Sequence, residues 1–220
     1  PFDGPSLRWY AEVLAEDDLT EALGNSLVVA AGSATVAVVL GFLAAYGLAR
    51  HVLPGSVFVR GLLIAPLTVS YLIVGLGLLI VLTRSGLGLS LWTAGIGHVV
   101  INLPLCFAII YASMGAQQQN AERAARDLGA REAQVVLLIT VPMLAPAILA
   151  AFFLSVTLSW DEFIIAFLLT RFDVTLPVEI WSMLRSGLSP RLNAIASLVF
   201  LVSVTLVLVL ELLVFGRRRR

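Results

Sequence analysis

The chain has 220 residues, of which 60% are hydrophobic and only 13% are charged, whereas soluble domains carry about 25% charged residues. A water-soluble fold of this length cannot bury so much apolar surface, so the composition predicts an integral membrane protein. The formal net charge is zero, and all 14 basic residues are arginine. A nucleotide-binding P-loop needs a lysine, which excludes a P-loop ATPase in this chain alone. The one cysteine, Cys106, excludes a disulfide framework and a cysteine metal site.

Five long apolar windows predict five transmembrane helices. A spanning helix needs about 20 apolar residues, whereas barrel strands alternate and are only about 10 residues long. The windows are Ala22 to Ala49, Gly61 to Thr83, Ser85 to Ala121 with its apolar centre at Leu91 to Met114, Ala133 to Trp160, and Leu192 to Leu210 with an extension to Phe215. A shorter apolar piece, Phe163 to Thr170, is either re-entrant or a continuation of the fourth helix. Because the sequence starts at Pro1 and not at a methionine, we expect a further segment before it.

The arginines predict the orientation, because cytoplasmic loops are enriched in basic residues. One set of connections holds nine arginines, namely Arg50, Arg60, Arg123, Arg126, Arg131 and Arg217 to Arg220, and we expect this set in the cytoplasm. The other set holds five, namely Arg8, Arg84, Arg171, Arg185 and Arg191, and most of the acidic residues lie with it. The terminal arginine run is typical of an anchor at anionic lipid headgroups and not of a nucleic-acid site. We expect Glu211 to pair with it.

The connection between the third and fourth windows, residues 115–135, is polar and contains a predicted short helix. Ala121 to Leu128 is rich in helix formers, and Gly129 offers a helix stop. Ala124 and Ala125 form, with Leu128, a small apolar face surrounded by charges. Such an amphipathic helix is either a docking element for a partner protein or an ordinary interfacial loop, and the residues alone leave both interpretations open.

The segment from Ala121 to Pro142 resembles the signature loop of binding-protein-dependent ABC importer permeases. That motif is Glu-Ala-Ala, three residues, Gly, nine residues, Ile, one residue and Leu-Pro. Ala124, Ala125, Gly129, Ile139 and Pro142 match it at the right spacing, whereas Arg123 replaces the motif glutamate, with Glu122 one place earlier, and Val141 replaces the leucine. The resemblance implies that the residues coupling the chain to a cytoplasmic ATPase are Glu122, Arg123, Ala124, Ala125, Asp127 and Gly129.

Further stretches along almost the whole chain are similar to the second permease subunit of spermidine/putrescine importers. They are Ser6 to Tyr10, Asn25-Ser26, Ala49-Arg50, His98, Ala124 to Ala130, Thr157 to Phe163, Thr175 to Val178, Trp181 to Met183, Gly187 to Pro190 and Asn193-Ala194. This resemblance implies one all-α permease domain over residues 1–220, of the type I importer fold, with a sixth span before Pro1 and the docking loop at 115–135. It also implies a multi-pass protein of the bacterial inner membrane.

The same resemblance implies the partners. They are a homologous second permease, two copies of a cytoplasmic ABC ATPase and an extracytoplasmic solute-binding protein. ATP and Mg are then bound by the ATPase, so we expect no cofactor and no catalytic residue in this chain. Two other classes stay open on the residues alone. An ion-coupled secondary transporter is disfavoured because no internal repeat is visible. A membrane enzyme is disfavoured because only two histidines, His51 and His98, are available.

Asp161 and Glu162 are the main candidates for a substrate pathway. A polyamine is a flexible cation, and its passage needs carboxylates or aromatic faces. Both acids follow the fourth window and are flanked by Trp160 and Phe163. Because neighbouring residues on a helix point about 100° apart, we expect only one of them to line the path and favour Asp161. Its alternative role is a structural pair with Arg185.

Tyr71, Glu179 and Trp181 are further pathway candidates. Polyamine permeases carry a proline-acid pair where this chain has Ser70-Tyr71. This difference leaves other organic amines, aminophosphonates or opine-like compounds as alternative substrates. His98 and Asn102 lie four residues apart on one face of the third window. They are too few for a metal site, and we expect them to form hydrogen bonds between helices.

Overall fold

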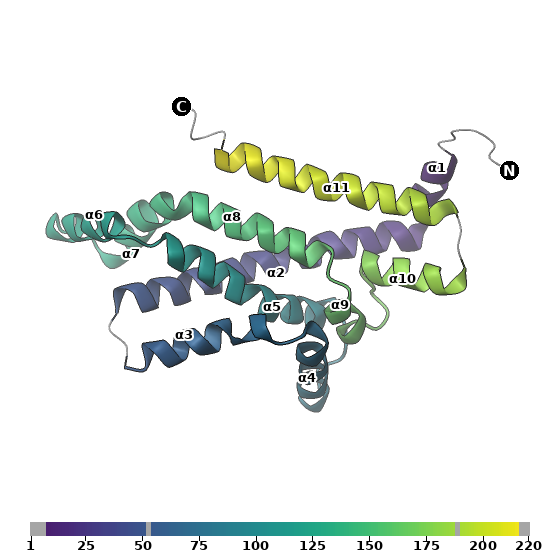
Figure 1. Ribbon diagram of the computed structural model, residues 1–220, viewed down its shortest axis with the longest axis horizontal. Coiled ribbons are helices and arrows are strands. Elements are labelled where there is room, and N and C mark those ends of the chain that lie inside the picture. Colours follow the sequence, from purple (N-terminus) through teal and green to yellow (C-terminus); the bar gives the residue numbers. More distant parts are fainter. Residues whose placement is uncertain (1–7, 52–53, 188–189, 216–220) are drawn as a thin grey trace.

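The computed structural model describes residues 8–51, 54–187 and 190–215, and within them every regular element is a helix (Figure 1). The predicted all-α class is therefore confirmed for this part of the chain. The α-helices are α1 (Arg8–Leu14), α2 (Asp17–Arg50), α3 (Ser56–Ile64), α4 (Tyr71–Arg84), α5 (Leu91–Ser113), α6 (Ala116–Asp127), α7 (Glu132–Val135), α8 (Val141–Trp160), α9 (Ile164–Leu169), α10 (Leu176–Ser186) and α11 (Pro190–Phe215), with a 3₁₀ turn η1 (Ala65–Thr68) and a π-turn η2 (Val136–Thr140).

Three described helices are long and apolar enough to cross a membrane. They are α2, α5 and the continuous stretch Glu132–Trp160, which joins α7, η2 and α8. They confirm the first and fourth predicted spans and the apolar centre of the third. Helix α11 has 26 residues and lies where the fifth span is predicted. The side chain of Glu211 and the run Arg217 to Arg220 lie outside the described residues, so their expected pairing has no structural counterpart to report.

The core lies where α2, α5 and α8 pack together. Its buried members include Ala37, Cys106, Ile110 and Leu144. A Cβ added to Gly41 of α2 would lie 2.9 Å from the backbone nitrogen of Phe107 on α5. Such a distance is too short for a real contact, so α2 and α5 approach as closely as a glycine permits. Small residues of this kind are what allows apolar helices to pack tightly inside a membrane, where no hydrophobic effect drives them together.

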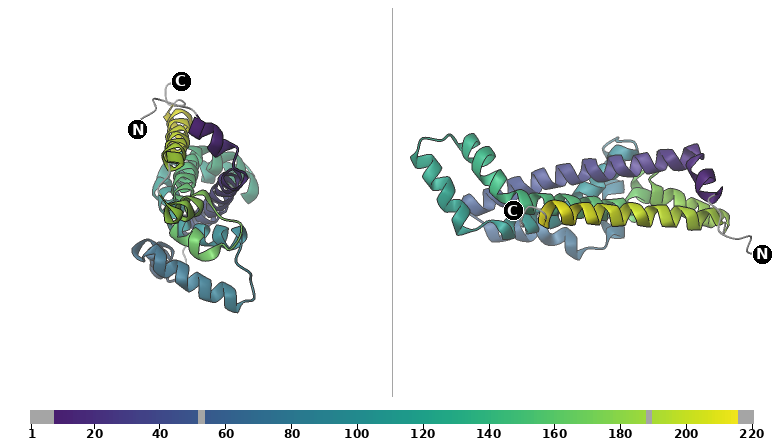
Figure 2. Two further views of the ribbon diagram at one scale, coloured as in Figure 1. Left: turned by 90° about the vertical axis from the view of Figure 1, so that its right-hand side faces the viewer. Right: turned by 90° about the horizontal axis from the view of Figure 1, so that it is seen from above.

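The second predicted span, Gly61 to Thr83, is present as a bent pair of helices and not as one straight helix. Helix α3 with η1 meets α4 at an angle of 107°, and α4 points away from the bundle (Figures 1 and 2). Pro66 has no N–H to donate to a preceding carbonyl, so the α-helix tightens into a 3₁₀ turn there. Val69 and Ser70 then adopt extended backbone angles, and a new helix begins at Tyr71.

The short apolar piece Phe163 to Thr170 forms a separate helix, α9, and does not continue the fourth span. The backbone N–H of Ser90 and the hydroxyl of Thr93 both donate to the carbonyl of Leu169, at 3.2 and 2.7 Å. These bonds tie the end of α9 to the start of α5. Helix α9 also packs against α4 in a cluster that contains Ile165. Of the two interpretations of the sequence, the structure supports a helix that folds back into the bundle.

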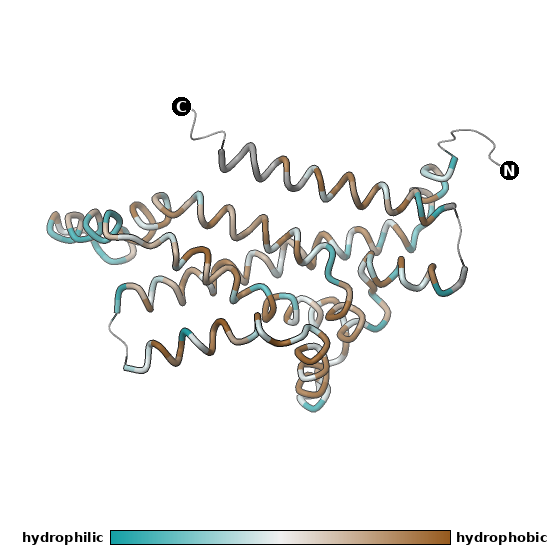
Figure 3. Tube along the Cα trace, viewed as in Figure 1, coloured by the Kyte–Doolittle hydropathy of each residue, from teal (hydrophilic) through white to brown (hydrophobic). Residues whose placement is uncertain are grey.

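Polar residues gather at the two ends of the bundle. Figure 3 shows hydrophilic positions around α6 and α7 at one end and around α1 and α10 at the other, with hydrophobic helices between them. The end with α6 and α7 also holds the C-terminal end of α2, so arginines of the predicted cytoplasmic set lie there together (Figure 1). This separation fits the predicted orientation, in which the end with α6 and α7 faces the cytoplasm.

Candidate functional site

An open cavity of about 880 Å³ lies beside the C-terminal end of α8, and we call it the Asp161 cavity. The residues that line it include Tyr71, Thr157, Asp161, Glu162, Phe163, Ile180, Ala196, Phe200 and Ser203. Asp161 follows the last residue of α8, and its side chain is exposed. Among the described residues no ion pair joins Asp161 to Arg185 or to another cation. The alternative pair of Asp161 with Arg185 is therefore not formed in this structure.

Glu162 lies in the same cavity wall, but its carboxylate is buried and holds α9 in place. It accepts hydrogen bonds from the backbone N–H groups of Ile164, Ile165 and Ala166 at 2.9, 2.8 and 3.2 Å. Its Oε2 also lies 3.6 Å from Nε2 of His98. These contacts satisfy groups at the start of α9 that have no partner within the helix. Asp161 is thus the more accessible acid of the two, which fits the preference drawn from the helical angle.

His98 forms hydrogen bonds between helices, as the sequence predicts. Its Nδ1 is hydrogen-bonded to the hydroxyl of Ser159 on α8, and Ser159 lies 3.2 Å from the hydroxyl of Ser33 on α2. This chain of contacts joins α5, α8 and α2 inside the bundle. Asn102 is buried, but its Nδ2 has no partner among the described residues. No group of three or more potential metal-binding side chains occurs in the part of the chain that the structure describes.

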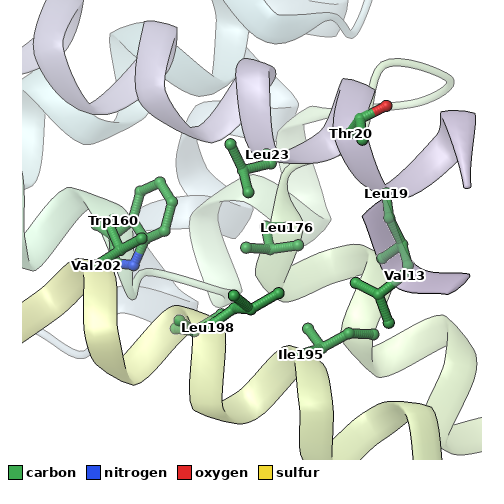
Figure 4. A pocket seen from close by; sticks show the side chains of 10 residues that line it. Val13, Leu19, Thr20, Leu23, Trp160, Leu176, Ile195, Leu198 and Val202 are labelled. Atoms are coloured by element: carbon green, nitrogen blue, oxygen red, sulfur yellow. The ribbon is translucent and has the colours of Figure 1, made fainter. Parts of the chain in front are cut away.

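Trp160 does not line the Asp161 cavity, in contrast to its expected place on the pathway. Its indole is buried in an apolar cluster between α2, α10 and α11, where it faces a small pocket with Leu23, Leu176 and Leu198 (Figure 4). The cause is the last turn of α8, because consecutive residues leave a helix in directions about 100° apart. Asp161 is thereby exposed, and Trp160 points into the core.

Glu179 and Trp181 line a second cavity of about 460 Å³, which we call the Glu179 cavity, together with Phe167, Val174, Val178, Ser182 and Arg185. The rings of Trp181 and Phe163 lie 5.6 Å apart, so the walls of the two cavities touch. Burial raises the pKa of Glu179, and repulsion from Asp18 and Glu16 raises it further. The ionised form of Glu179 is therefore disfavoured by its surroundings.

At the opposite end of the bundle, α6 is the polar helix that the sequence predicts, and it ends where expected. Gly129 has a φ of 88°. Its N–H donates to the carbonyl of Arg126 at 2.9 Å, and the N–H of Ala130 donates to the carbonyl of Ala125 at 3.0 Å. This is the Schellman arrangement that closes many helices on a glycine. The predicted helix stop at Gly129 is confirmed.

The side chains of α6 divide into an exposed face and a buried one. On α6, Arg123, Ala124 and Asp127 are exposed. In the turn that follows α6, Gly129 is exposed and Leu128 is 89% exposed. Ala125 is partly buried. The exposed residues among these form the exposed face of α6. We expect Arg123, in the place of the motif glutamate, to contribute to coupling with an ATPase.

Glu122 lies on the buried face of α6 and is fully enclosed. It receives two hydrogen bonds from Arg50 of α2, at 2.7 and 3.0 Å, and one from the hydroxyl of Thr140 at 2.9 Å. Among the six residues expected to couple to an ATPase, Glu122 therefore cannot touch a partner directly. Sequence analysis did not find the contribution of Arg50 and Thr140. The only local signals were a charge at the end of the first span and a hydroxyl at the start of the fourth.

A bundle of spanning helices, with an acidic cavity at one end and an amphipathic helix at the other, is the architecture of a membrane transport permease. The sequence model of the family "Binding-protein-dependent transport system inner membrane component" matches residues 37–219. The match covers most of the chain, so the chain belongs to this family and is a multi-pass component of the inner membrane. This family is a family of transport subunits, and it differs from the enzyme and secondary-transporter classes considered above.

The relatives in this family include polyamine permeases. The spermidine/putrescine transport system permease protein PotC of Escherichia coli (strain K12) is 30% identical over 214 residues, which cover 96% of this chain and 81% of PotC. The putrescine transport system permease protein PotI of the same strain is 36% identical over 205 residues, covering 89% of this chain and 73% of PotI. A crystal structure of an amino acid ABC transporter with histidines has the same fold, with a TM-score of 0.68 at 17% identity, covering 98% of this chain and 100% of the other.

Proposed function

We propose that this chain is the permease subunit of an ATP-driven importer for a polyamine such as spermidine or putrescine. The similarity to PotC and PotI over most of the chain supports the substrate class. In this proposal a solute-binding protein delivers the polyamine, and a homologous second permease completes the pathway. Two copies of a cytoplasmic ATPase bind ATP and Mg and dock on the exposed face of α6. This chain then contributes the pathway and no catalytic residue.

The observation that carries the proposal is the exposed Asp161, which has no cationic partner among the described residues. A carboxylate at membrane depth is costly unless it faces water or meets a cation. Tyr71, Phe163 and Phe200 line the same cavity and can offer aromatic faces to an ammonium group. Glu179 in the adjoining cavity provides a second acid, which suits a solute with more than one positive charge.

A second candidate substrate class follows from Arg185, which lines the Glu179 cavity with Glu179 itself. A guanidinium beside a carboxylate fits a solute that carries both charges, such as an aminophosphonate or an opine-like compound. The presence of Tyr71, where polyamine permeases have an acid, also favours this second substrate class. Uptake of such a solute, with no uptake of polyamines, would favour this candidate.

The test is uptake of labelled spermidine and putrescine by the assembled importer in proteoliposomes, with Asp161→Asn compared with the unchanged complex. The substitution removes the charge and keeps the shape, so we expect uptake to fall by at least about tenfold, which corresponds to the loss of about 1.4 kcal/mol. Subunit levels and the affinity of the binding protein for polyamine should stay the same. Asp173→Asn is the matched control, because Asp173 is exposed and lies outside both cavity walls. Normal uptake by Asp161→Asn at normal subunit levels would refute the proposed role of Asp161.

A further inference from the structure

Glu122 joins three elements that are separate in the sequence. Its carboxylate is fully buried and lies between the end of α2, the middle of α6 and the start of α8. Arg50, whose side chain is only 9% exposed, binds both carboxylate oxygens. Such a two-pronged pair in a buried place fixes orientation as well as distance. Removal of either partner leaves an uncompensated buried charge, so the contact acts as a rigid link and not as a loose surface bridge.

The link to α8 passes through Thr140, which is fully buried at the end of the π-turn η2. Its hydroxyl donates to Oε1 of Glu122 at 2.9 Å. The wide turn has a local cause. Pro142 cannot donate a hydrogen bond to the carbonyl four residues earlier, and the N–H of Val141 instead donates to the carbonyl of Val136, five residues back. Single π-turns inside long helices occur often at functional sites.

Helix α8 connects the contact at Glu122 to the Asp161 cavity. Its 20 residues run from Val141 to Trp160, with Asp161 immediately after them, and a helix of that length spans about 30 Å. The direct chain connection between α6 and α8 passes instead through the glycine turn at Gly129 and the short helix α7. That connection is braced by a pair between Arg126 and Glu132, at 2.6 Å, in which the glutamate side chain is 69% exposed. Because exposed ion pairs are weak, the buried contact at Glu122 is the stronger connection between α6 and α8.

We propose that Glu122 is the positioning residue that makes α6 and α8 move together, so that a displacement of α6 reaches the Asp161 cavity through Thr140. The inference rests on the proposed function, since the docked ATPase is what moves α6. In this proposal Glu122 contacts other helices of the same chain and transmits a movement between them. It does not contact the ATPase. Arg50 holds the carboxylate at the right distance and orientation, and Thr140 receives the movement at the residue directly before α8.

Thr140→Val in the assembled importer is the most selective test. Valine keeps the branched shape of the buried side chain and removes only the hydroxyl, while the Arg50–Glu122 pair stays intact. The probe is the rate at which a maleimide modifies a cysteine introduced at Ala196 in the cavity wall, with and without ADP and vanadate. The natural Cys106 is buried and gives little background. ATP hydrolysis stimulated by polyamine-loaded binding protein is measured in parallel.

We expect the nucleotide-dependent change in cysteine reactivity, and the stimulated hydrolysis, to fall about tenfold in Thr140→Val, because one hydrogen bond to a charged group is lost. Thr140→Ser should restore both. Thr35→Val should leave both unchanged, since Thr35 is exposed and, among the described residues, its hydroxyl donates only to the carbonyl of Ala31 in its own helix. An unchanged response in Thr140→Val, or a response that serine does not restore, would overturn the inference.

The two proposals can fail separately. If the cysteine reactivity of the unchanged complex responds to nucleotide but polyamine-loaded binding protein does not stimulate hydrolysis, the polyamine assignment fails. The cysteine reactivity of Thr140→Val then still decides the role of Glu122. If polyamine uptake is normal but the introduced cysteine at Ala196 reacts equally with and without nucleotide, no movement reaches the cavity. That result would overturn the inference about Glu122 and leave the substrate assignment in place.

Discussion

Gly129→Val should disturb the turn that ends α6 and thereby weaken coupling to the ATPase. Gly129 has a φ of 88°, a region in which a residue with a Cβ is strained. The two bonds that close the helix, from the N–H groups of Gly129 and Ala130, depend on this conformation. Valine can relieve the strain only by changing the turn, and this change would shift the exposed face of α6.

The magnitude follows from the backbone alone. Among the described residues, nothing lies within 4 Å of a Cβ added to Gly129, so no steric clash with neighbours contributes. A residue with a Cβ in the left-handed region costs about 1–2 kcal/mol, with β-branched residues at the upper end. The closed turn should therefore lose a factor of about 5 to 30 in its population for Gly129→Val, and less for Gly129→Ala.

The assay is ATP hydrolysis by the reconstituted importer, with and without polyamine-loaded binding protein. Stimulation of ATP hydrolysis should be highest in the unchanged protein, lower in Gly129→Ala and lowest in Gly129→Val. The amount of inserted subunit should stay constant. Gly47→Ala is the matched control, because Gly47 lies inside α2 with ordinary helical angles, and among the described residues nothing lies within 4 Å of a Cβ added to it. Alanine in a helix is more favourable than glycine by up to about 1 kcal/mol, so this control should not lose stimulation. Full stimulation in Gly129→Val would refute the reasoning.

Two further predictions concern orientation and pH. A cysteine introduced at Arg126 should resist an impermeant thiol reagent in intact cells, whereas one at Asp17 should react, and the reverse pattern would contradict the predicted topology. Because burial raises the pKa of Glu179, the folded state binds this proton more tightly than the unfolded state, and stability is lost as pH rises through the raised pKa. Glu179→Gln should therefore raise the midpoint of thermal unfolding at about pH 8, and the gain should shrink towards about pH 4, near the ordinary pKa. An equal shift at both pH values would exclude this explanation.

The sequence predicts the spanning helices well because their signal is local. Long apolar runs identify α2, α5 and α8, and the conformational freedom of glycine identifies the end of α6 at Gly129. The bend after Pro66 escapes prediction from hydropathy, because an apolar window measures composition and not direction. The proline and the polar Ser70 are the only local signs of the break, and both also occur within membrane helices that continue.

The functional contacts are harder to predict because they join distant segments. Arg50 and Glu122 are 72 positions apart in the chain, and no periodicity links them. Trp160 and Asp161 are neighbours at the end of one helix, and both qualify as pathway residues by position. Only the packing of α10 and α11 around the last turn of α8 determines that the indole is buried and the carboxylate exposed.

The break between η1 and α4 has a consequence for biosynthesis. Val69 and Ser70 leave the helical path and are exposed on the isolated chain. Hydrocarbon does not tolerate irregular backbone on its surface, because each unsatisfied polar group costs several kcal/mol there. At membrane depth this stretch must therefore be covered by protein or by water in a cavity. A newly inserted copy without its partners would expose a polar defect to lipid, the kind of defect that membrane quality control can detect. We therefore expect a copy without its partners to have a shorter lifetime than an assembled one.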